Sequence, residues 1–427
     1  MASTYLTRTP SSAGNRKTWT WSAWIKLGVL GTPRNLFGAY AHAADNLAIN
    51  IADTDTVSIR FYNNTEYQLG LNRVFRDTSA WYHLVFAIDT TLATEADRFI
   101  IYVNGVRETS FQAGANSQPT LDLQMTINEA TATQIGRFNT GSYFDGEMSH
   151  INFIDGTAYD ATAFGEYDAN GVWTIKTSPS VTYGTNGFFI LKNGNSVTDQ
   201  SGNSNNFTVG GGTLTNTEDS PSNVFATWNP LVPLGSFSYG NTVWDSVSSG
   251  DGSAFSTLGA EAGKYYMECK VTTSNTDGWE LGVAPAQRLD GAANGVGTTT
   301  IGGVGYTGDG NIRRAGSTVA SGQTTFSQND IIGCALDMDT RKVYFYKNGT
   351  ALYGGVGVDL PSTTGAYLFG TGDWWGGVAT QSTANFGNGY FGTTAVTDAG
   401  TNASGIGIFE YDVPTGFTAL STKGLNL

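Results

Sequence analysis

Apolar and polar residues alternate with a period of two along much of the chain, and no segment sustains a 3.6-residue apolar repeat over three turns. Such alternation places the apolar side chains of an extended segment on one face of a sheet. The 427 residues include 56 glycines, and glycine supplies the positive φ angles that tight turns require. Charged residues make up 14% of the chain, compared with ~25% in typical soluble domains. These features predict an all-β protein of short strands and tight turns.

Each half of the chain contains an Asn-Gly turn. Asn104-Gly105 and Asn348-Gly349 both follow a run of alternating aromatic and β-branched residues. Asn-Gly fits the two positive-φ positions of a type I′ turn, so each pair predicts a β-hairpin. At ~100–200 residues per domain, one such hairpin per half predicts two antiparallel β-sandwich (jelly-roll) domains in tandem. The clearest strand segments are residues 19–26, 81–89, 99–103, 265–271, 331–337 and 342–346.

A change of composition separates the two halves. Residues 193–212 are rich in Asn, Gly and Ser, which is typical of a solvated connector. Phe225 and Trp228 follow in a proline-containing stretch that is typical of an extended segment docked on a neighbouring surface. We therefore predict a first domain at residues 1–192, a connector with a docking segment at 193–235, and a second domain at 236–427.

The formal net charge is −14 and the isoelectric point is near 4.5. Such a chain repels phosphate backbones and anionic lipid surfaces, which argues against nucleic acid and membranes as partners. No apolar run approaches the ~18 residues of a membrane span, and the first residues lack the pattern of a secretory signal. We therefore expect a protein that is made in the cytoplasm and does not insert into membranes. The two cysteines, Cys269 and Cys334, lie in apolar runs and are predicted to be buried thiols.

The second half of the chain, from about residue 237 to 427, resembles a SPRY domain. The resemblance is carried by separated blocks in the expected order, at residues 263–271, 278–283, 304–306, 329–337, 342–349 and 384–387. It implies a concanavalin-like β-sandwich whose edge loops recognise partners, with no catalytic residues.

The first half of the chain is similar to laminin-G or concanavalin A-like jelly rolls. The matching blocks are residues 19–25, 81–86, 104–105, 135–137 and 144–151. The resemblance implies a second β-sandwich, of a class that often binds calcium.

The pairing of these two modules resembles virion proteins of marine bacteriophages, which often join such a sandwich to a SPRY module. Three further phrases carry this resemblance, at residues 164–173, 219–230 and 413–420. It implies a non-enzymatic structural or adhesion protein of the virion, placed on the tail, a tail fibre or the capsid surface. The implied partners are other virion subunits, further copies of the chain, and host-surface polysaccharide. A dedicated glycan-binding receptor and a jelly-roll glycoside hydrolase are the alternatives.

The carboxylate pattern of jelly-roll glucanases is missing from the sequence. Retaining enzymes of this kind hold an acid and a nucleophile ~5 Å apart, and their Glu-x-Asp-x-x-Glu pattern does not occur here. The nearest match is Glu95-x-Asp97, where Ile100 stands in place of the second glutamate. The three histidines are far apart and form no zinc motif: His42, His83 and His150. We therefore predict no enzymatic activity and no catalytic cofactor.

Calcium remains a possible cofactor because the resemblance makes it relevant. The candidate oxygen ligands are Asp53 and Asp55, Asp145 with Glu147, and Asp337 with Asp339. None of these pairs has the spacing of an EF-hand loop. The alternative for each aspartate is that it ends a strand by accepting hydrogen bonds from the next backbone amides.

The strongest binding motif is the Gly-rich segment 370–377, which contains Asp373, Trp374 and Trp375. Successive side chains of an extended segment point to opposite faces, so at most one of these tryptophans can enter the core. An exposed tryptophan beside an aspartate suits a protein interface or a glycan, and packing within the domain is the third interpretation. Tyr306 and Arg313 lie on another Gly-rich stretch that is predicted to share this rim.

Overall fold

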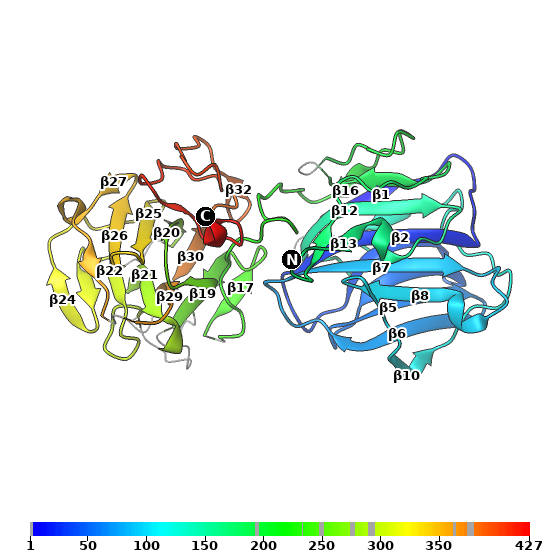
Figure 1. Ribbon diagram of the computed structural model, residues 1–427, viewed down its shortest axis with the longest axis horizontal. Coiled ribbons are helices and arrows are strands. Elements are labelled where there is room, and N and C mark those ends of the chain that lie inside the picture. Colours follow the sequence, from blue (N-terminus) through cyan, green and yellow to red (C-terminus); the bar gives the residue numbers. More distant parts are fainter. Residues whose placement is uncertain are drawn as a thin grey trace. The chain divides into compact units, whose positions relative to one another are not determined.

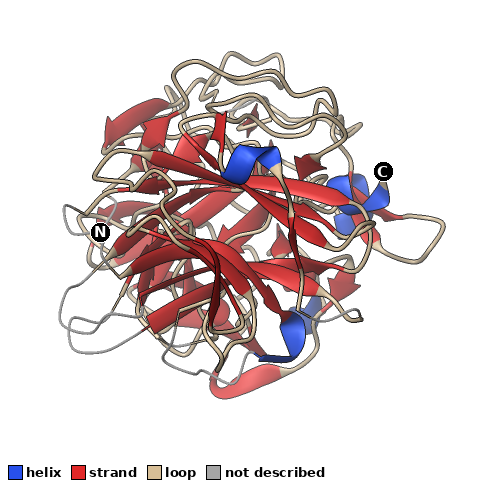
Figure 2. Cartoon of the chain, turned by 90° about the vertical axis from the view of Figure 1, so that its left-hand side faces the viewer, coloured by secondary structure: helices blue, strands red, loops and turns tan. Residues whose placement is uncertain are grey.

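The computed structural model describes residues 3–192, 196–232, 234–246, 252–273, 278–288, 295–361, 364–373 and 380–427. Regular structure in these ranges is β-strand apart from short 3-10 helices (blue in Figure 2), which confirms the predicted all-β class. The 3-10 helices are η1 (Glu95–Asp97), η2 (Ala161–Ala163), η3 (Ala286–Arg288), η4 (Tyr353–Gly355) and η5 (Gly424–Asn426). No helix in the same ranges is long and apolar enough to cross a membrane. Backbone contacts divide the chain into unit 1, Met1–Asn216, and unit 2, Thr217–Leu427.

Unit 1 is built on two antiparallel sheets (Figure 1). The larger sheet has the order β10-β6-β5-β4-β3-β11-β1-β16, and the smaller has the order β15-β12-β2-β7-β8-β9. A separate ribbon pairs β13 with β14. The strands are β1 (Tyr5–Arg8), β2 (Thr18–Leu27), β3 (Arg34–His42), β4 (Asp45–Ile51), β5 (Thr56–Asn63), β6 (Glu66–Val74), β7 (Trp81–Asp89), β8 (Phe99–Val103), β9 (Val106–Arg107), β10 (Phe111–Asn116), β11 (Thr133–Ile135), β12 (Gly146–Asp155), β13 (Gly165–Tyr167), β14 (Trp173–Ile175), β15 (Phe188–Ile190) and β16 (Thr208–Gly211).

The core of unit 1 lies between the two sheets and follows the period-two alternation of the sequence. In β2, Trp19 and Trp21 are fully buried in this core, and Trp24 lies on the opposite face of the strand. Phe37 of β3 stacks on Trp21 with ring centroids 5.6 Å apart, which joins one sheet to the other. Trp19 and Trp21 therefore share the core face of β2, and Trp24 lies on its outer face.

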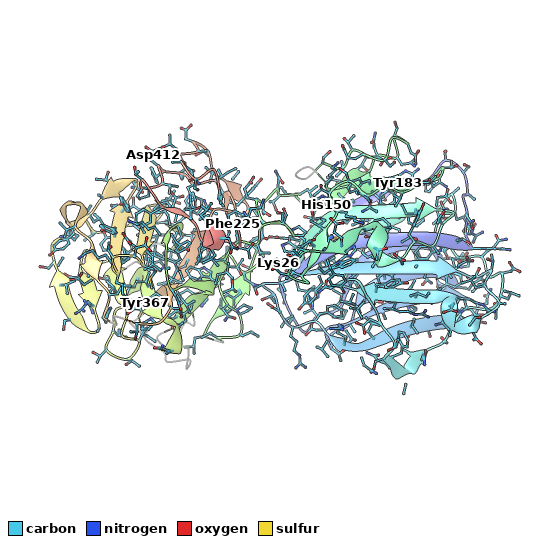
Figure 3. The ribbon with its side chains drawn as sticks, viewed as in Figure 1. Lys26, His150, Tyr183, Phe225, Tyr367 and Asp412 are labelled. Carbon is cyan, nitrogen blue, oxygen red and sulfur yellow. The ribbon has the colours of Figure 1, made fainter. Side chains whose placement is uncertain are left out.

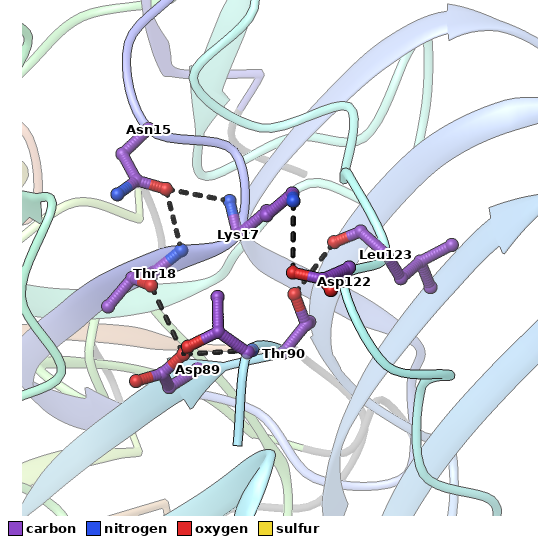
Figure 4. Close-up of polar contacts among 8 residues, drawn as sticks. Asn15, Lys17, Thr18, Asp89, Thr90, Asp122 and Leu123 are labelled. Atoms are coloured by element: carbon purple, nitrogen blue, oxygen red, sulfur yellow. Dashed lines mark hydrogen bonds and ion pairs between the residues drawn. The ribbon is translucent and has the colours of Figure 1, made fainter. Parts of the chain in front are cut away.

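Polar contacts fix one end of the central β2–β7 pair, where β2 begins and β7 ends (Figure 4). Asn15 Oδ1 accepts hydrogen bonds of 2.9 Å from the backbone N–H groups of Lys17 and Thr18, which turns the chain into β2. The Thr18 hydroxyl donates to Asp89 Oδ1 at the end of β7, at 3.2 Å. Lys17 Nζ contacts Asp122 at 3.0 Å. These contacts hold the register that the buried apolar face also specifies.

Unit 2 is likewise built on two sheets (Figure 1). One has the order β17-β18-β30-β20-β25-β26-β27, with β28 paired to β26 and β33 paired in parallel to β20, and the other has the order β19-β29-β21-β22-β23-β24. A ribbon pairs β31 with β32. The strands are β17 (Ser236–Ser238), β18 (Val243–Asp245), β19 (Gly252–Ala260), β20 (Lys264–Val271), β21 (Trp279–Pro285), β22 (Val304–Thr307), β23 (Ile312–Arg314), β24 (Ser317–Ala320), β25 (Ile331–Asp337), β26 (Lys342–Lys347), β27 (Thr350–Ala351), β28 (Val358–Asp359), β29 (Tyr367–Asp373), β30 (Gln381–Asn385), β31 (Tyr390–Phe391), β32 (Thr394–Ala395) and β33 (Thr418–Ala419).

The predicted strands and hairpins are confirmed. The six segments correspond to β2, β7, β8, β20, β25 and β26, each to within one residue at either end. Asn104 and Gly105 have φ angles of +48° and +81°, and Asn348 and Gly349 have φ angles of +45° and +76°. In both turns the Asn side-chain oxygen accepts a 2.8 Å hydrogen bond from a backbone N–H of the adjacent strand. Cys269 and Cys334 are buried free thiols, as predicted.

The stretch predicted as a connector is divided between the units. β16 extends the larger sheet of unit 1 by pairing with β1. Phe225 forms a bridge with Ser421, and Trp228 forms a bridge with Ser256. Both aromatic side chains are buried in unit 2, where Figure 3 labels Phe225. The segment predicted to dock therefore packs as part of the unit 2 sandwich.

Candidate functional site

The predicted rim of unit 2 starts at Asp373, the last residue of β29. Asp373 lies in register with Gly252, the first residue of β19, and with Trp279, the first residue of β21. Three adjacent strands of this sheet therefore begin or end at the same level. Trp374 and Trp375, the predicted binding aromatics, lie outside the described residues.

The Asp373 side chain is directed into the sandwich and is almost fully buried. Its Oδ2 accepts hydrogen bonds from the hydroxyls of Ser246, at 3.2 Å, and Thr380, at 3.4 Å. The Thr380 N–H also donates to the Ser246 hydroxyl at 2.8 Å. Asp373 thus ties β29 to the segments at the edge of the neighbouring sheet, and its carboxylate supports the rim from inside.

Tyr306 occupies a different place from the one predicted. Its ring is fully buried in the unit 2 core, between Phe326 at 5.1 Å and Phe345 at 5.9 Å, measured between ring centroids. Its hydroxyl donates to the backbone oxygen of Thr324. The flanking glycines give the stretch a loop-like sequence, but residues 304–307 form β22 and the alternation of that strand directs Tyr306 inward.

Arg313 lies beside a buried carboxylate that the sequence reasoning missed. Arg313 Nη2 contacts Asp309 at 3.3 Å. Its charge also helps to stabilise the ionised form of Glu280, which is fully buried on the outer face of β21. The Glu280 Oε1 accepts from the Gly297 N–H at 2.8 Å, and Oε2 has no hydrogen-bond partner among the described residues.

Burial raises the pKa of Glu280 to about 7, against the opposing effects of the backbone amides of Gly297 and Val296. A Cβ atom at Gly305 would come within 1.8 Å of the carboxylate, so the neighbouring strand requires glycine at that position. Glu280 therefore holds residues 295–297 against the sheet. Its only sequence signal is a single glutamate inside the apolar run 279–285.

A second buried carboxylate, Glu268 of β20, holds the C-terminal segment of the chain. It accepts hydrogen bonds from the N–H of Glu410 at 2.8 Å, the N–H of Tyr411 at 2.9 Å and the Tyr266 hydroxyl at 3.2 Å. Burial raises its pKa to about 7, and the three hydrogen bonds oppose that shift. The C-terminal stretch around Asp412, labelled in Figure 3, is thereby attached to unit 2.

Two of the calcium candidates of unit 1, Asp55 and Asp145, lie near the positive charge of Arg34. Asp53 is exposed, and Asp55 is buried in an ion pair with Arg34 at 2.7 Å, where it also accepts from the Gly31 N–H at 2.9 Å. Burial raises the pKa of Asp145, and the charge of Arg34 opposes that shift. Arg34 thus supplies a positive charge to both carboxylates. Among the described residues, no three His, Cys, Asp or Glu side chains are grouped as metal ligands.

The remaining calcium candidates also have protein partners. Lys264 contacts Asp337 at 2.9 Å, and Asp339 accepts a 2.8 Å hydrogen bond from the N–H of Gly263. The Thr340 N–H donates to Asp337 at 2.9 Å, as expected for an aspartate that ends a strand.

His83 lies in an aromatic stack on the outer face of the smaller unit 1 sheet. The indole of Trp24 stacks on the His83 ring at 4.8 Å, and that of Trp173 lies nearly parallel to the His83 ring at 5.9 Å, measured between ring centroids. His83 Nδ1 accepts from Trp173 Nε1–H at 3.0 Å, and Nε2 lies 2.9 Å from the Ser22 hydroxyl. Full burial lowers the pKa of His83 to about 3, so the ring is neutral. Burial likewise lowers the pKa of His150 (Figure 3) to about 4.

A pocket of about 130 Å³ lies on the larger sheet of unit 1, between β3–β5 and the turn at residues 138–142. Its lining residues include Asn35, Asn50, Arg60 and Phe138. The sequence reasoning missed this pocket because its residues come from separate segments and form no local motif.

Comparisons with known proteins agree with the two sandwiches. A family model described as the concanavalin A-like lectin/glucanases superfamily matches residues 2–162. A family model described as the SPRY domain matches residues 264–367. The chain carries a concanavalin-like domain and a SPRY domain. The first lies in unit 1 and the second in unit 2, so the resemblance of each half to its domain family is confirmed.

Several solved structures are similar to parts of the chain. The SPRY domain of human HERC1 shares 21% sequence identity, with coverage of 33% of this chain and 86% of that chain and a TM-score of 0.28. The PSpry domain of TRIM65 shares 15% identity, with 37% and 90% coverage and a TM-score of 0.29. The heptameric SAP-like pentraxin from Limulus polyphemus shares 14% identity, with 37% and 72% coverage and a TM-score of 0.27. No relative was found among curated proteins.

Proposed function

We propose that this protein is a non-enzymatic structural and adhesion protein of a bacteriophage particle, in which both β-sandwiches bind other virion subunits. The proposal rests on one observation: the chain joins a concanavalin-like domain to a SPRY domain and adds to each of them the segments that resemble phage virion proteins. These segments are residues 164–173, 219–230 and 413–420, and they lie outside the two matched ranges.

The added segments have defined structural roles, which supports treating them as part of the architecture. In unit 1, residues 164–173 lead from η2 through β13 to Trp173, whose indole stacks on His83 and covers the smaller sheet. In unit 2, residues 219–230 bring Phe225 and Trp228 into the sandwich, and residues 413–420 include β33, which pairs with β20. Each sandwich, with its added segment packed on it, is a scaffold that presents its loops to partners.

The roles of the buried ionisable groups support a binding function for the protein over a catalytic one. His83, Glu268 and Glu280 each hold neighbouring segments in place through hydrogen bonds within their own unit. A catalytic acid or base must instead reach a substrate. In this proposal the protein acts through its surfaces, and its partners are virion subunits and further copies of itself.

Quantitative mass spectrometry of gradient-purified phage particles tests the proposal. We expect the protein in a fixed ratio to the major capsid protein: a low ratio indicates a tail or fibre position, and a ratio near one indicates capsid decoration. A non-structural protein of the same phage serves as the control for contamination. Absence of the chain from purified particles would overturn the proposal.

A dedicated glycan-binding receptor is the second candidate function. The observation that favours this function is the polar pocket on unit 1. Ligand binding there can be measured with the purified protein, without phage particles.

A further inference from the structure

Asn-Gly pairs are chemically reactive as well as favourable in turns. The backbone nitrogen of the second residue can attack the side-chain amide of the asparagine, and glycine leaves that nitrogen accessible because it has no Cβ atom. The described part of the chain contains five such pairs, which begin at Asn104, Asn170, Asn186, Asn348 and Asn388. Because the side chain must turn towards the backbone to react, the folded structure determines which pair is reactive.

Four of these five pairs hold the asparagine in place. Asn186 and Asn388 are buried, with 3% and 7% of their surface exposed. Asn104 Oδ1 accepts a 2.8 Å hydrogen bond from a backbone N–H of the adjacent strand. Asn348 is exposed, but its Oδ1 accepts from a backbone N–H at 2.8 Å and its Nδ2 donates to Asp330 Oδ1 at 2.7 Å. In each of these pairs the side chain must lose a contact before it can react.

Asn170 lies in an exposed turn, and its side chain makes no hydrogen bond to any residue that the structure describes. The next residue, Gly171, has a φ of +78°, and a Cβ atom there would meet nothing within 4 Å, so the approach to its nitrogen is open. The Gly171 N–H donates to the Asp168 backbone oxygen at 3.0 Å, and this bond must open before the nitrogen can attack. Residues 166–172 are all exposed, which favours such local opening.

The turn at 168–172 closes the β13–β14 ribbon and positions Trp173. Asp168 Oδ1 accepts from the Val172 N–H at 2.9 Å, and the Asp168 N–H donates to the Val172 oxygen at 2.9 Å. Trp173 follows directly, and its indole N–H donates to His83 Nδ1 at 3.0 Å. Because β13 and β14 pair over only three residues each, the turn contributes much of the order of the ribbon.

We propose that Asn170 is a site of spontaneous modification, at which conversion to isoaspartate releases the β13–β14 ribbon from the smaller sheet of unit 1. The Gly171 nitrogen bonds to Cγ of Asn170, and the side-chain nitrogen leaves as ammonia with the proton of the Gly171 N–H, which gives a cyclic imide. Water then adds to one of the two imide carbonyls. Cleavage of the bond between nitrogen and Cγ gives aspartate. Cleavage of the other bond gives isoaspartate, whose backbone runs through Cβ and Cγ and is one methylene group longer.

The two products differ in their effect on the ribbon. Aspartate adds one negative charge and keeps the backbone length, so the turn closes as before. Isoaspartate adds the same charge and lengthens the backbone between Asp168 and Val172, which separates the groups that form the turn hydrogen bonds. Trp173 then leaves His83, and the face on which Trp24 stacks against His83 becomes accessible. The age of the protein thereby controls the exposure of an aromatic surface.

The test follows the Asn-Gly pairs of the purified full-length protein during incubation at mildly alkaline pH. Peptide mapping by mass spectrometry measures the loss of each asparagine, and labelling with an isoaspartyl methyltransferase identifies isoaspartate. We expect Asn170 to react at least about tenfold faster than Asn348, because the two side-chain hydrogen bonds of Asn348 must open first. In urea, where the folded contacts are lost, both asparagines should react at similar rates.

Hydrogen exchange of residues 165–175 measures the order of the ribbon. Protection should fall in protein that carries isoaspartate at position 170, and it should keep its initial value in incubated Asn170→Gln, whose longer side chain forms the imide far more slowly. The matched control is Asn170→Asp, which has the added charge with the normal backbone length and should also keep its protection.

Three results would overturn the proposal. Asn170 could react no faster than Asn348 in the folded protein, the ribbon could keep its protection after isoaspartate has formed, or Asn170→Asp could lose protection to the same extent. The last result would mean that charge, and not backbone length, opens the ribbon. None of these outcomes bears on whether the chain is present in phage particles.

Discussion

Unit 1 and unit 2 each close a hairpin with Asn-Gly and cover its glycine with an aromatic ring from a later segment. A Cβ atom on Gly105 would lie 2.5 Å from the ring of Trp173, and one on Gly349 would lie 2.7 Å from the ring of Tyr411. In both units the covering residue lies outside the range that matches the domain family. The two halves therefore fasten an added segment to the sandwich at the same structural position.

The units differ in the ionisable groups that they bury. Unit 1 contains the buried His83 and the partly buried His150, with lowered pKa values of about 3 and 4, whereas unit 2 buries Glu268 and Glu280 with raised pKa values of about 7. In each case burial favours the neutral form. A sandwich can thus bury either kind of group when polar partners are present, but the choice gives the two units opposite responses to pH.

The largest expected effects come from one buried tryptophan in each unit. Trp21→Ala should destabilise unit 1 and Trp228→Ala should destabilise unit 2 by about 3–5 kcal/mol each, because both leave a large cavity. Urea unfolding can be followed by thiol labelling for unit 2, which holds both cysteines, and by pulsed hydrogen exchange of β2 for unit 1. Tyr167→Ala, at an exposed aromatic of unit 1, is the control. If Trp228→Ala left thiol protection unchanged, the segment at 219–230 would not be part of unit 2.

Replacing the titrating carboxyl of Glu280 should have an effect of intermediate size on the stability of unit 2. Between pH 5 and 7, unit 2 should lose about 2 kcal/mol less stability in Glu280→Gln than in the unaltered protein, because glutamine does not ionise. Thiol-labelling midpoints in urea at several pH values measure this. The control, Glu261→Gln at an exposed position, should keep the pH dependence of the unaltered protein. An unchanged pH slope in Glu280→Gln would show that Glu280 ionises normally in the folded state.

The two turn glycines should give the smallest effects and the closest match between units. Gly105→Ala and Gly349→Ala each force a side chain into a positive-φ position, at about 1 kcal/mol, and each added methyl group also displaces an aromatic ring. Gly171→Ala is the control, because its φ is +78° but a Cβ atom there meets nothing within 4 Å. Thermal unfolding should rank both hairpin variants below the control in stability. Equal losses in all three would mean that ring coverage contributes nothing.

Local pattern was sufficient to predict the strands and the turns. The alternation at residues 81–89 and the Asn-Gly pair at 104–105 each specify a conformation through residues close in sequence. The burial of Tyr306 could not be predicted, because it depends on packing against Phe326 and Phe345 across the sandwich. The raised pKa of Glu280 depends in the same way on the chain segment that covers it. The pocket around Asn35 and Phe138 joins segments about a hundred residues apart, so it exists only in the folded sheet.

The most direct test of the account is the pH dependence of each unit's stability in the unaltered protein between pH 5.5 and 7. In unit 1, the unfolded histidines bind protons that the folded ones do not, so stability should fall as the pH decreases below 6.5. In unit 2, the folded glutamates keep protons that the unfolded ones release, so stability should fall as the pH increases from 4.5 towards 7. Urea midpoints from pulsed hydrogen exchange of β2 and from thiol labelling should therefore move in opposite directions with pH, and midpoints that move together would contradict the account.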